Sequence, residues 1–330
     1  MMKVKRMCSL NMIFITTLLA ILCLPSMLLA DNQPQTGVIT ISQKTTERGG
    51  VTSSDKSGFP VTIDSPGSYR LVSNLTVPDG NTTAIEIDSN NVTIDLNGFS
   101  IIGPVSSGLG RGINSTSYAG DNVTIINGSI IGVGNFGIFV RDNCRIENVH
   151  AISNGLVGIV TGAECTIKGN IVANNDNSGI IAGSGSTVSY NIAEQNGSRG
   201  IDCNNSVVTW NTAVNNVTDG FHLGGGGSTV INNTSINNGG HGFNVWGSST
   251  IYGNTATGNG GNGIVDGDGT LAKGNSLVMN NTVSFNVYYG LNLHNGTGYA
   301  NNVINNNIDG TVTGGVPLGT NVCNGDTTCP

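Results

Sequence analysis

Beyond position 30 the chain has no long apolar segment, no helical pattern and few basic side chains. No later stretch reaches the ~20 apolar residues of a membrane-spanning helix, so we expect no transmembrane segment in the mature chain. No window of ten or more residues after position 31 repeats its apolar residues with a helical period. Of 13 Lys and Arg residues, three lie before position 31, which leaves ten against 20 Asp and Glu. Nucleic acid is therefore a poor partner, because phosphate binding needs clustered Lys and Arg.

Several motifs that identify an enzyme class are also missing. The chain has no nucleophile elbow, no Cys-x-x-Cys site and no phosphate loop, and its glycine run at 224–227 is followed by neither a Lys nor a helix. The sequence therefore indicates a shape more clearly than a reaction.

What the chain has instead is a repeat. A Gly followed by an apolar residue recurs at a near-constant step of about 21 positions, with one longer step before Gly290. A near-constant step of this size is typical of a solenoid, in which each repeat stacks on its neighbours. The glycines that begin each step are Gly137, Gly158, Gly179, Gly200, Gly220, Gly242, Gly263 and Gly290.

Each repeat contains three short strand-like runs separated by Gly, Ser and Asn. In residues 179–199 these runs are 179–181, 186–190 and 191–194. Three strands per ~21-residue coil predict an all-β fold, a single-stranded right-handed parallel β-helix of about ten coils. Each coil would add ~4.8 Å along the axis. We expect the residue after each Gly to point inward, and Gly itself and the residue two beyond it to point outward.

Two columns of Asn recur with the same step, and they account for much of the total of 46 Asn residues. Both columns fall where strands bend, and Asn tolerates the left-handed backbone region there. Stacked Asn side chains can also form a hydrogen-bonded ladder. Most N-x-S/T sequons in these columns are therefore interpreted as ladder and turn residues rather than glycan acceptors. The columns are Asn170, Asn191, Asn211, Asn233, Asn254 and Asn281, and Asn154, Asn175, Asn196, Asn216, Asn238, Asn259 and Asn286.

The chain divides into four segments. Residues 1–30 combine a basic start, an apolar core and a cleavage site after Ala30, which predicts a secretory signal peptide and a secreted or periplasmic protein. Residues 31–58 form an N-terminal lead-in, residues 59–310 the β-helix with its N-terminal cap, and residues 311–330 a C-terminal cap.

The cysteines fit an oxidising compartment. Cys323 and Cys329 in the polar tail are expected to form a disulfide. Cys144 and Cys165 occupy the same position of adjacent coils, so they are either a disulfide or an unbonded inward stack. Cys203 has no evident partner.

The Ser65–Val77 segment, the Asn91–Gly103 segment and the Gly-Ile coils together resemble a group of secreted bacterial right-handed β-helix proteins. The repeats of that group are of the kind found in pectate lyases, polygalacturonases and periplasmic NosD-like proteins. The resemblance covers nearly all of the mature chain and implies the fold, which hosts lyases, hydrolases, epimerases and adhesins. Two fragments around Asp219 and His241 resemble polygalacturonase motifs, but the paired Asp and the R-x-K motif of that family are missing.

One group of polar residues is the candidate site. The residues immediately before Gly and those two after it change together from apolar to polar near Arg199. They should lie on three successive coils within roughly 10 Å along the axis. An Asp beside a His is a usable acid–base pair, and Arg can hold a uronate carboxylate. The predicted catalytic residues are Arg199, Asp202, Asp219, His222 and His241, and the predicted substrate-binding residues are Asn244, Trp246 and Tyr289.

These residues favour an exported protein that binds, and as a lyase or hydrolase cleaves, an extended acidic polysaccharide. The alternative is a non-catalytic surface solenoid, a rigid spacer or an adhesin, for which outward polar residues need no ligand. Asp266 and Asp268 lie in a Gly-rich turn that could bind Ca²⁺, and no other cofactor is indicated. The sequence does not define an oligomeric state or a substrate.

Overall fold

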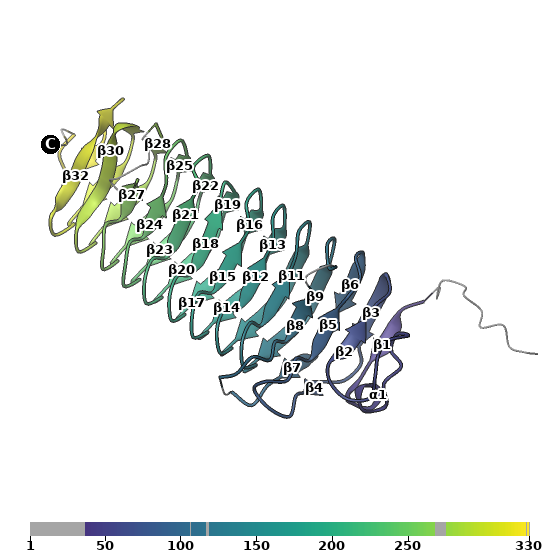
Figure 1. The fold of residues 1–330 in the computed structure, drawn as a ribbon. Helices are drawn as coiled ribbons and strands as arrows, with labels where there is room; N and C mark the ends of the chain where they lie inside the picture. The colour runs from purple at the N-terminus through teal and green to yellow at the C-terminus, as the bar shows by residue number, and fades with distance from the viewer. Residues whose placement is uncertain (1–36, 106, 117–118, 268–274, 328, 330) are drawn as a thin grey trace, which may run out of the picture. The chain divides into compact units, whose positions relative to one another are not determined.

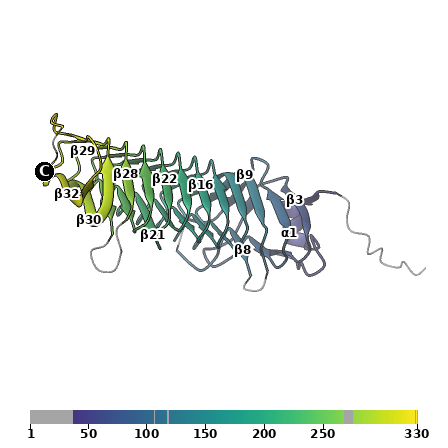
Figure 2. The ribbon, with the colours of Figure 1, turned by 90° about the horizontal axis from the view of Figure 1, so that it is seen from above.

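The computed structural model describes residues 37–105, 107–116, 119–267, 275–327 and 329, so the predicted signal peptide at 1–30 and Asp268 lie outside the described residues. Residues 37–330 cluster as one compact unit. Short strands stack in register from β1 at the purple end to β32 at the yellow end (Figures 1 and 2). None of the described helices is long and apolar enough to cross a membrane.

Three parallel sheets run the length of the stack. They are joined in places where one strand continues around a corner, as in β9, β11, β30 and β32. Sheet 1, which carries the candidate site, has one strand from each coil. Its strands are β2 (Val61–Ile63), β5 (Ile85–Ile87), β8 (Ile113–Ser115), β10 (Ile138–Val140), β12 (Ile159–Thr161), β15 (Ile180–Ala182), β18 (Ile201–Asn204), β21 (Phe221–Gly224), β24 (Phe243–Val245), β27 (Ile264–Asp266), β30 (Tyr289–Ala300) and β32 (Gly310–Pro317).

Sheet 2 follows sheet 1 in every coil and ends with the second parts of β30 and β32. Its other strands are β1 (Ile39–Ile41), β3 (Gly67–Leu71), β6 (Val92–Asp95), β9 (Thr124–Ile131), β11 (Arg145–Ile152), β13 (Thr166–Lys168), β16 (Thr187–Ser189), β19 (Val207–Thr209), β22 (Thr229–Ile231), β25 (Thr250–Tyr252) and β28 (Leu277–Met279).

Sheet 3 completes each coil and includes the second halves of β9 and β11. Its other strands are β4 (Leu75–Thr76), β7 (Ser100–Ile102), β14 (Ile171–Ala173), β17 (Ile192–Glu194), β20 (Thr212–Val214), β23 (Thr234–Ile236), β26 (Thr255–Thr257), β29 (Thr282–Ser284), β31 (Val303–Asn305) and β33 (Val322–Cys323). The stack thus has about 12 coils rather than the ten expected, because the coils before Gly137 have turns of irregular length.

The core fills the interior of this stack with one or two apolar side chains per strand. In sheet 1 the middle residue of each strand faces outward and its neighbours face inward, as in β10, where Ile138 and Val140 are buried and Phe139 is not. Isoleucine and valine dominate the core, since β-branched side chains pack well on a pleated surface. The inward direction predicted for the residue after each Gly is confirmed.

The outward direction predicted for Gly itself is wrong. A Cβ atom built on Gly200 would lie 2.7 Å from the carbonyl oxygen of Gly220 and 2.8 Å from the amide nitrogen of Asn216. Gly is needed there because the backbone approaches the buried Asn column too closely for any side chain.

The Asn columns form two continuous buried ladders. Asn191, for example, donates its amide N–H to the Oδ1 of Asn211 at 3.0 Å and to the carbonyl of Ile167 at 2.9 Å. The expectation that ladder residues adopt the left-handed conformation is wrong. That conformation belongs to the exposed residue just before, such as Asn215 (φ 54°) before Asn216 or Tyr190 (φ 57°) before Asn191.

The first and last described segments of the chain lie at the two ends of the stack. Within residues 37–58, β1 pairs with β3, and helix α1 (Gln43–Arg48) lies at the same end (Figure 1). At the other end β32 and β33 add the last strands, and Cys323 and Cys329 form a disulfide with Cα atoms 5.4 Å apart.

The three remaining cysteines are buried in the middle of the stack. Cys144 and Cys165 form a second disulfide between adjacent coils, with Cα atoms 4.5 Å apart. Cys203 is a free buried thiol, and burial together with the nearby Asp202 raises its pKa to about 12. A thiol in this state is a packing residue rather than a nucleophile.

Candidate functional site

The outward-facing row of sheet 1 is continuous in register. Asp202 pairs with His222, and His222 pairs with Asn244. The residues just before each Gly form a parallel row, in which the backbone carbonyls of Arg199, Asp219 and His241 each accept the N–H of the preceding coil's Gly. The structure therefore brings these six predicted residues onto three successive coils of one face.

The first cluster on this face is Arg199, Asp202 and His222. The guanidinium of Arg199 donates to one carboxylate oxygen of Asp202 at 2.6 Å, and the Nδ1 of His222 lies 3.0 Å from the other. Burial raises the pKa of Asp202, but the hydrogen bonds from His222 and Arg199 outweigh it and hold that pKa below its ordinary value. An ionised Asp202 favours the neutral tautomer of His222 with its proton on Nδ1, and in that tautomer the lone pair on Nε2 can act as a base.

The second cluster centres on Asp219 and His241. Asp219 is buried, and its carboxylate accepts the backbone N–H of His241 at 2.7 Å and the side-chain N–H of Asn244 at 3.2 Å. The Nδ1 of His241 accepts the backbone N–H of Asn262 at 3.0 Å. Burial lowers the pKa of His241, although Asp219 opposes this. His241 is therefore neutral with its proton on Nε2, and it can donate a hydrogen bond.

The two predicted aromatic residues differ in position. The ring of Trp246 meets that of His222 edge to face, with centroids 5.8 Å apart. Tyr289 lies beyond Asn262 in the row before Gly, two coils from His241, and its backbone N–H donates to the side chain of Asn262 at 2.9 Å. Trp246 thus belongs to the site, and Tyr289 can only extend it.

Of the two Asp residues of the predicted calcium turn, the structure describes Asp266. Asp266 is the last residue of β27 and points inward, where its carboxylate accepts hydrogen bonds from the hydroxyls of Ser276, at 2.8 Å, and Thr297. Asp268 lies outside the described residues. In the part of the chain that the structure describes, no three His, Cys, Asp or Glu side chains gather as a metal site.

A hollow of about 610 Å³ lies on the same face, and the sequence reasoning missed it. It spans strands β5, β8, β10 and β12 of sheet 1 and the turns that follow them, and we name it the Arg111 hollow. Its lining includes Glu86, Arg111, Asn114, Ser115, Thr116, Phe139, Val140, Arg141, Asp142, Thr161 and Gly162.

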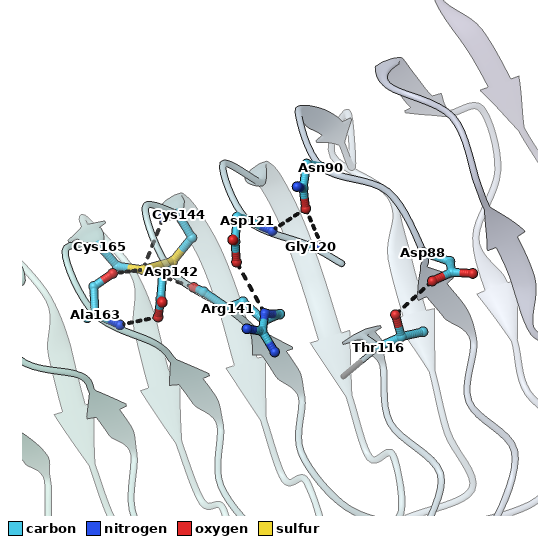
Figure 3. A network of polar contacts seen from close by, with 10 residues as sticks. All are labelled: Asp88, Asn90, Thr116, Gly120, Asp121, Arg141, Asp142, Cys144, Ala163 and Cys165. Atoms are coloured by element: carbon cyan, nitrogen blue, oxygen red, sulfur yellow. Dashed lines mark hydrogen bonds and ion pairs between the residues drawn. A yellow bond between two sulfur atoms is a disulfide. The ribbon is translucent and has the colours of Figure 1, made fainter. Parts of the chain in front are cut away.

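A polar network holds the turn side of the Arg111 hollow in place (Figure 3). Arg141 pairs with Asp121 at 3.2 Å, and Asp142 accepts the backbone N–H of Ala163 at 2.7 Å. Thr116 donates its hydroxyl hydrogen to Asp88 at 2.8 Å. These contacts tie successive turns together, so the wall of the hollow is fixed before any ligand enters.

A signal for this hollow does exist in the sequence. Gly112-Ile113 repeats the motif that begins each later coil, with Arg111 just before the Gly and Asn114 two residues after it. The step from Gly112 to Gly137 is longer than the regular step of the following coils, so the coil that contains Arg111 does not fit the regular spacing that starts at Gly137.

Comparisons with known proteins agree with this architecture. The family model described as right handed beta helix region matches residues 111–255. The chain folds as a right-handed parallel β-helix. A comparison with curated protein sequences found no match.

Solved structures similar to this β-helix protein include two polysaccharide epimerases and a tailspike. The A-module of mannuronan C-5 epimerase AlgE4 from Azotobacter vinelandii has a TM-score of 0.59 at 17% identity, with 86% of each chain covered. The periplasmic alginate epimerase AlgG has a TM-score of 0.53 at 15% identity, covering 86% of this chain and 81% of that one. The Dettilon tailspike protein gp208 has a TM-score of 0.53 at 16% identity, covering 86% and 60%. At these identities the likeness concerns the fold.

Proposed function

We propose that this protein is exported and that the outward face of sheet 1 binds an extended acidic polysaccharide lying along the stack. One observation carries the proposal. Among the described residues, four buried side-chain atoms lack a hydrogen-bond partner, and two of them belong to outward residues of this face. These two are the Oδ1 of Asn244 and the Nε1 of Trp246, and the others are the Oγ of Ser115 and the Oδ1 of Asn305.

A buried donor or acceptor without a hydrogen bond lowers the stability of the folded protein. Its presence in a native structure therefore points to a ligand or a water molecule that supplies the missing hydrogen bond. A polysaccharide suits the requirement because its hydroxyls both donate and accept. Since β8, which borders the Arg111 hollow, and β24 are six steps apart in sheet 1, the hollow and Asn244 are separated by about 29 Å along the stack. An extended polymer reaches both positions, whereas one small molecule does not.

Two of the solved neighbours support the choice of polymer. Their names state that they act on mannuronan and on alginate. Arg111 on sheet 1 supplies a guanidinium group that an acidic polymer needs.

If the face is catalytic, the geometry favours cleavage by elimination over hydrolysis. Hydrolysis needs a protonated carboxyl group, and the lowered pKa of Asp202 keeps that group ionised. His222 can take the proton from the carbon next to a uronate carboxylate. The electron pair then forms a carbon–carbon double bond as the glycosidic C–O bond breaks, and the leaving oxygen takes a proton from solvent.

The test is calorimetric titration of the protein with uronate oligosaccharides and with neutral glucans, with and without added Ca²⁺. Unsaturated products and reducing ends are followed in parallel. The expected result is binding of uronates and not of glucans. His222→Ala should abolish any turnover while binding and melting temperature are retained.

His150→Ala is the matched control, since His150 is exposed on sheet 3. Binding without turnover would make the protein a recognition module. Absence of binding to all polymers would overturn the proposal in favour of a structural solenoid.

A further inference from the structure

The same local geometry occurs twice on sheet 1, with one difference in charge. In two coils an Arg just before the Gly donates its Nη1 hydrogen to the side chain three residues later. In one coil the pair is Arg199 and Asp202, and the two charges cancel. In the other the pair is Arg111 and Asn114, and the amide leaves the guanidinium charged.

Arg111 is held by aromatic rings rather than by an acid. Its guanidinium carbon lies 4.9 Å from the ring centroid of Phe136 and 4.6 Å from that of Phe139, and the two rings stack on each other. Among the described residues Arg111 has no salt bridge, and its charge is only partly offset by Glu86 across the hollow. Burial accordingly lowers the pKa of Arg111, although Glu86 opposes the effect.

The two other charged groups on the turn side of the hollow are already engaged. Arg141 pairs with Asp121, and Asp142 accepts a backbone N–H. The Oγ of Ser115 has no partner, but Ser115 lies at an inward position of β8. Arg111 is therefore the charged group of this lining from which an anionic ligand would gain most.

We propose that the Arg111 hollow is the subsite that binds the carboxylate of one uronate residue, through the guanidinium of Arg111. The inference rests on the proposed function of sheet 1 and names the residue that selects acidic over neutral polymers. A planar guanidinium matches a carboxylate with two parallel hydrogen bonds. Glu86 and Asn114 can accept sugar hydroxyls, and Phe139 offers an apolar surface to the sugar ring. A volume of about 610 Å³ is in the usual range for a ligand site.

The decisive variant is Asn114→Asp, because it converts the Arg111 pair into a copy of the Arg199–Asp202 pair, which this fold already contains. The carboxylate at position 114 then neutralises the charge of the Arg111 guanidinium without moving it. We expect the affinity for a tri-uronate to fall about tenfold or more, and a neutral trisaccharide to be unaffected. Asn215→Asp adds the same charge at an exposed turn and serves as the control.

Arg111→Gln should give the same loss, and its control is Arg145→Gln, which removes one positive charge from sheet 2. Titration calorimetry measures the affinities, and circular dichroism establishes that each variant is folded. Uronate binding that is unchanged in both Arg111 and Asn114 variants would overturn this inference and leave the proposed function standing. Absence of uronate binding to the unmodified protein would overturn both.

Discussion

Replacing Asn191 by Leu is expected to destabilise the protein by about 3 kcal/mol or more. The Oδ1 of Asn191 accepts the backbone and the side-chain N–H of Asn170, both at 2.9 Å, and its amide donates to the carbonyl of Ile167 at 2.9 Å. Leu has the same branching and number of side-chain heavy atoms but no polar atoms, so four buried groups lose a hydrogen bond, the fourth being the Oδ1 of Asn211. Each loss costs roughly 1–3 kcal/mol. Burial of the apolar side chain offsets about 2 kcal/mol of this.

Urea unfolding followed by circular dichroism measures the difference in free energy. Asn215→Gly is the control, because Asn215 is exposed and Gly tolerates its positive φ of 54°. We expect that variant to lie within about 0.5 kcal/mol of the unmodified protein. A change below about 1 kcal/mol for Asn191→Leu would refute the view that the ladders stabilise the stack.

Three further predictions concern single groups. Tyr190→Asn should raise the free energy of unfolding in urea by about 1 kcal/mol, because Asn tolerates the left-handed backbone at φ 57° better than Tyr does. A lower free energy of unfolding would show that the stacking of Tyr190 on Trp210 contributes more than the backbone strain costs. Asp202→Asn should lower the free energy of unfolding at pH 7, and because the pKa of Asp202 is depressed in the folded protein, the difference from the unmodified protein should vanish as the pH falls from about 5 to below 3. A difference that does not change with pH would contradict this prediction. Nitrogen NMR at pH 7 should show His241 neutral with its proton on Nε2, and an imidazolium there would contradict the lowered pKa.

The fold was predictable because the repeat of about 21 residues can be recognised in the amino-acid sequence. One Gly and two ladder Asn recur in each regular coil, and each has a steric or hydrogen-bonding reason to recur. The sequence predicted less reliably which residues face outward and which take the left-handed conformation. Gly200 is buried against a carbonyl group, and the left-handed residue is the one before each ladder Asn. Both depend on how closely adjacent coils approach, which a one-dimensional pattern does not contain.

The candidate site was predictable only where the period is regular. Asp202, His222 and Asn244 lie one coil apart in register and do meet. Arg111 was missed because an irregular turn follows its coil. The Gly-rich sequence around Asp266 resembles a turn and does not reveal that its neighbours in register, Val245 and Leu293, face the core.

The central claim is that the outward face of sheet 1 is the polysaccharide-binding surface. A crystal structure of the protein with a bound uronate oligosaccharide tests it most directly. We predict that the polymer lies along sheet 1, with one carboxylate on Arg111 and hydroxyls on Asn244 and Trp246. A polymer bound on sheet 2 or sheet 3 would contradict the account.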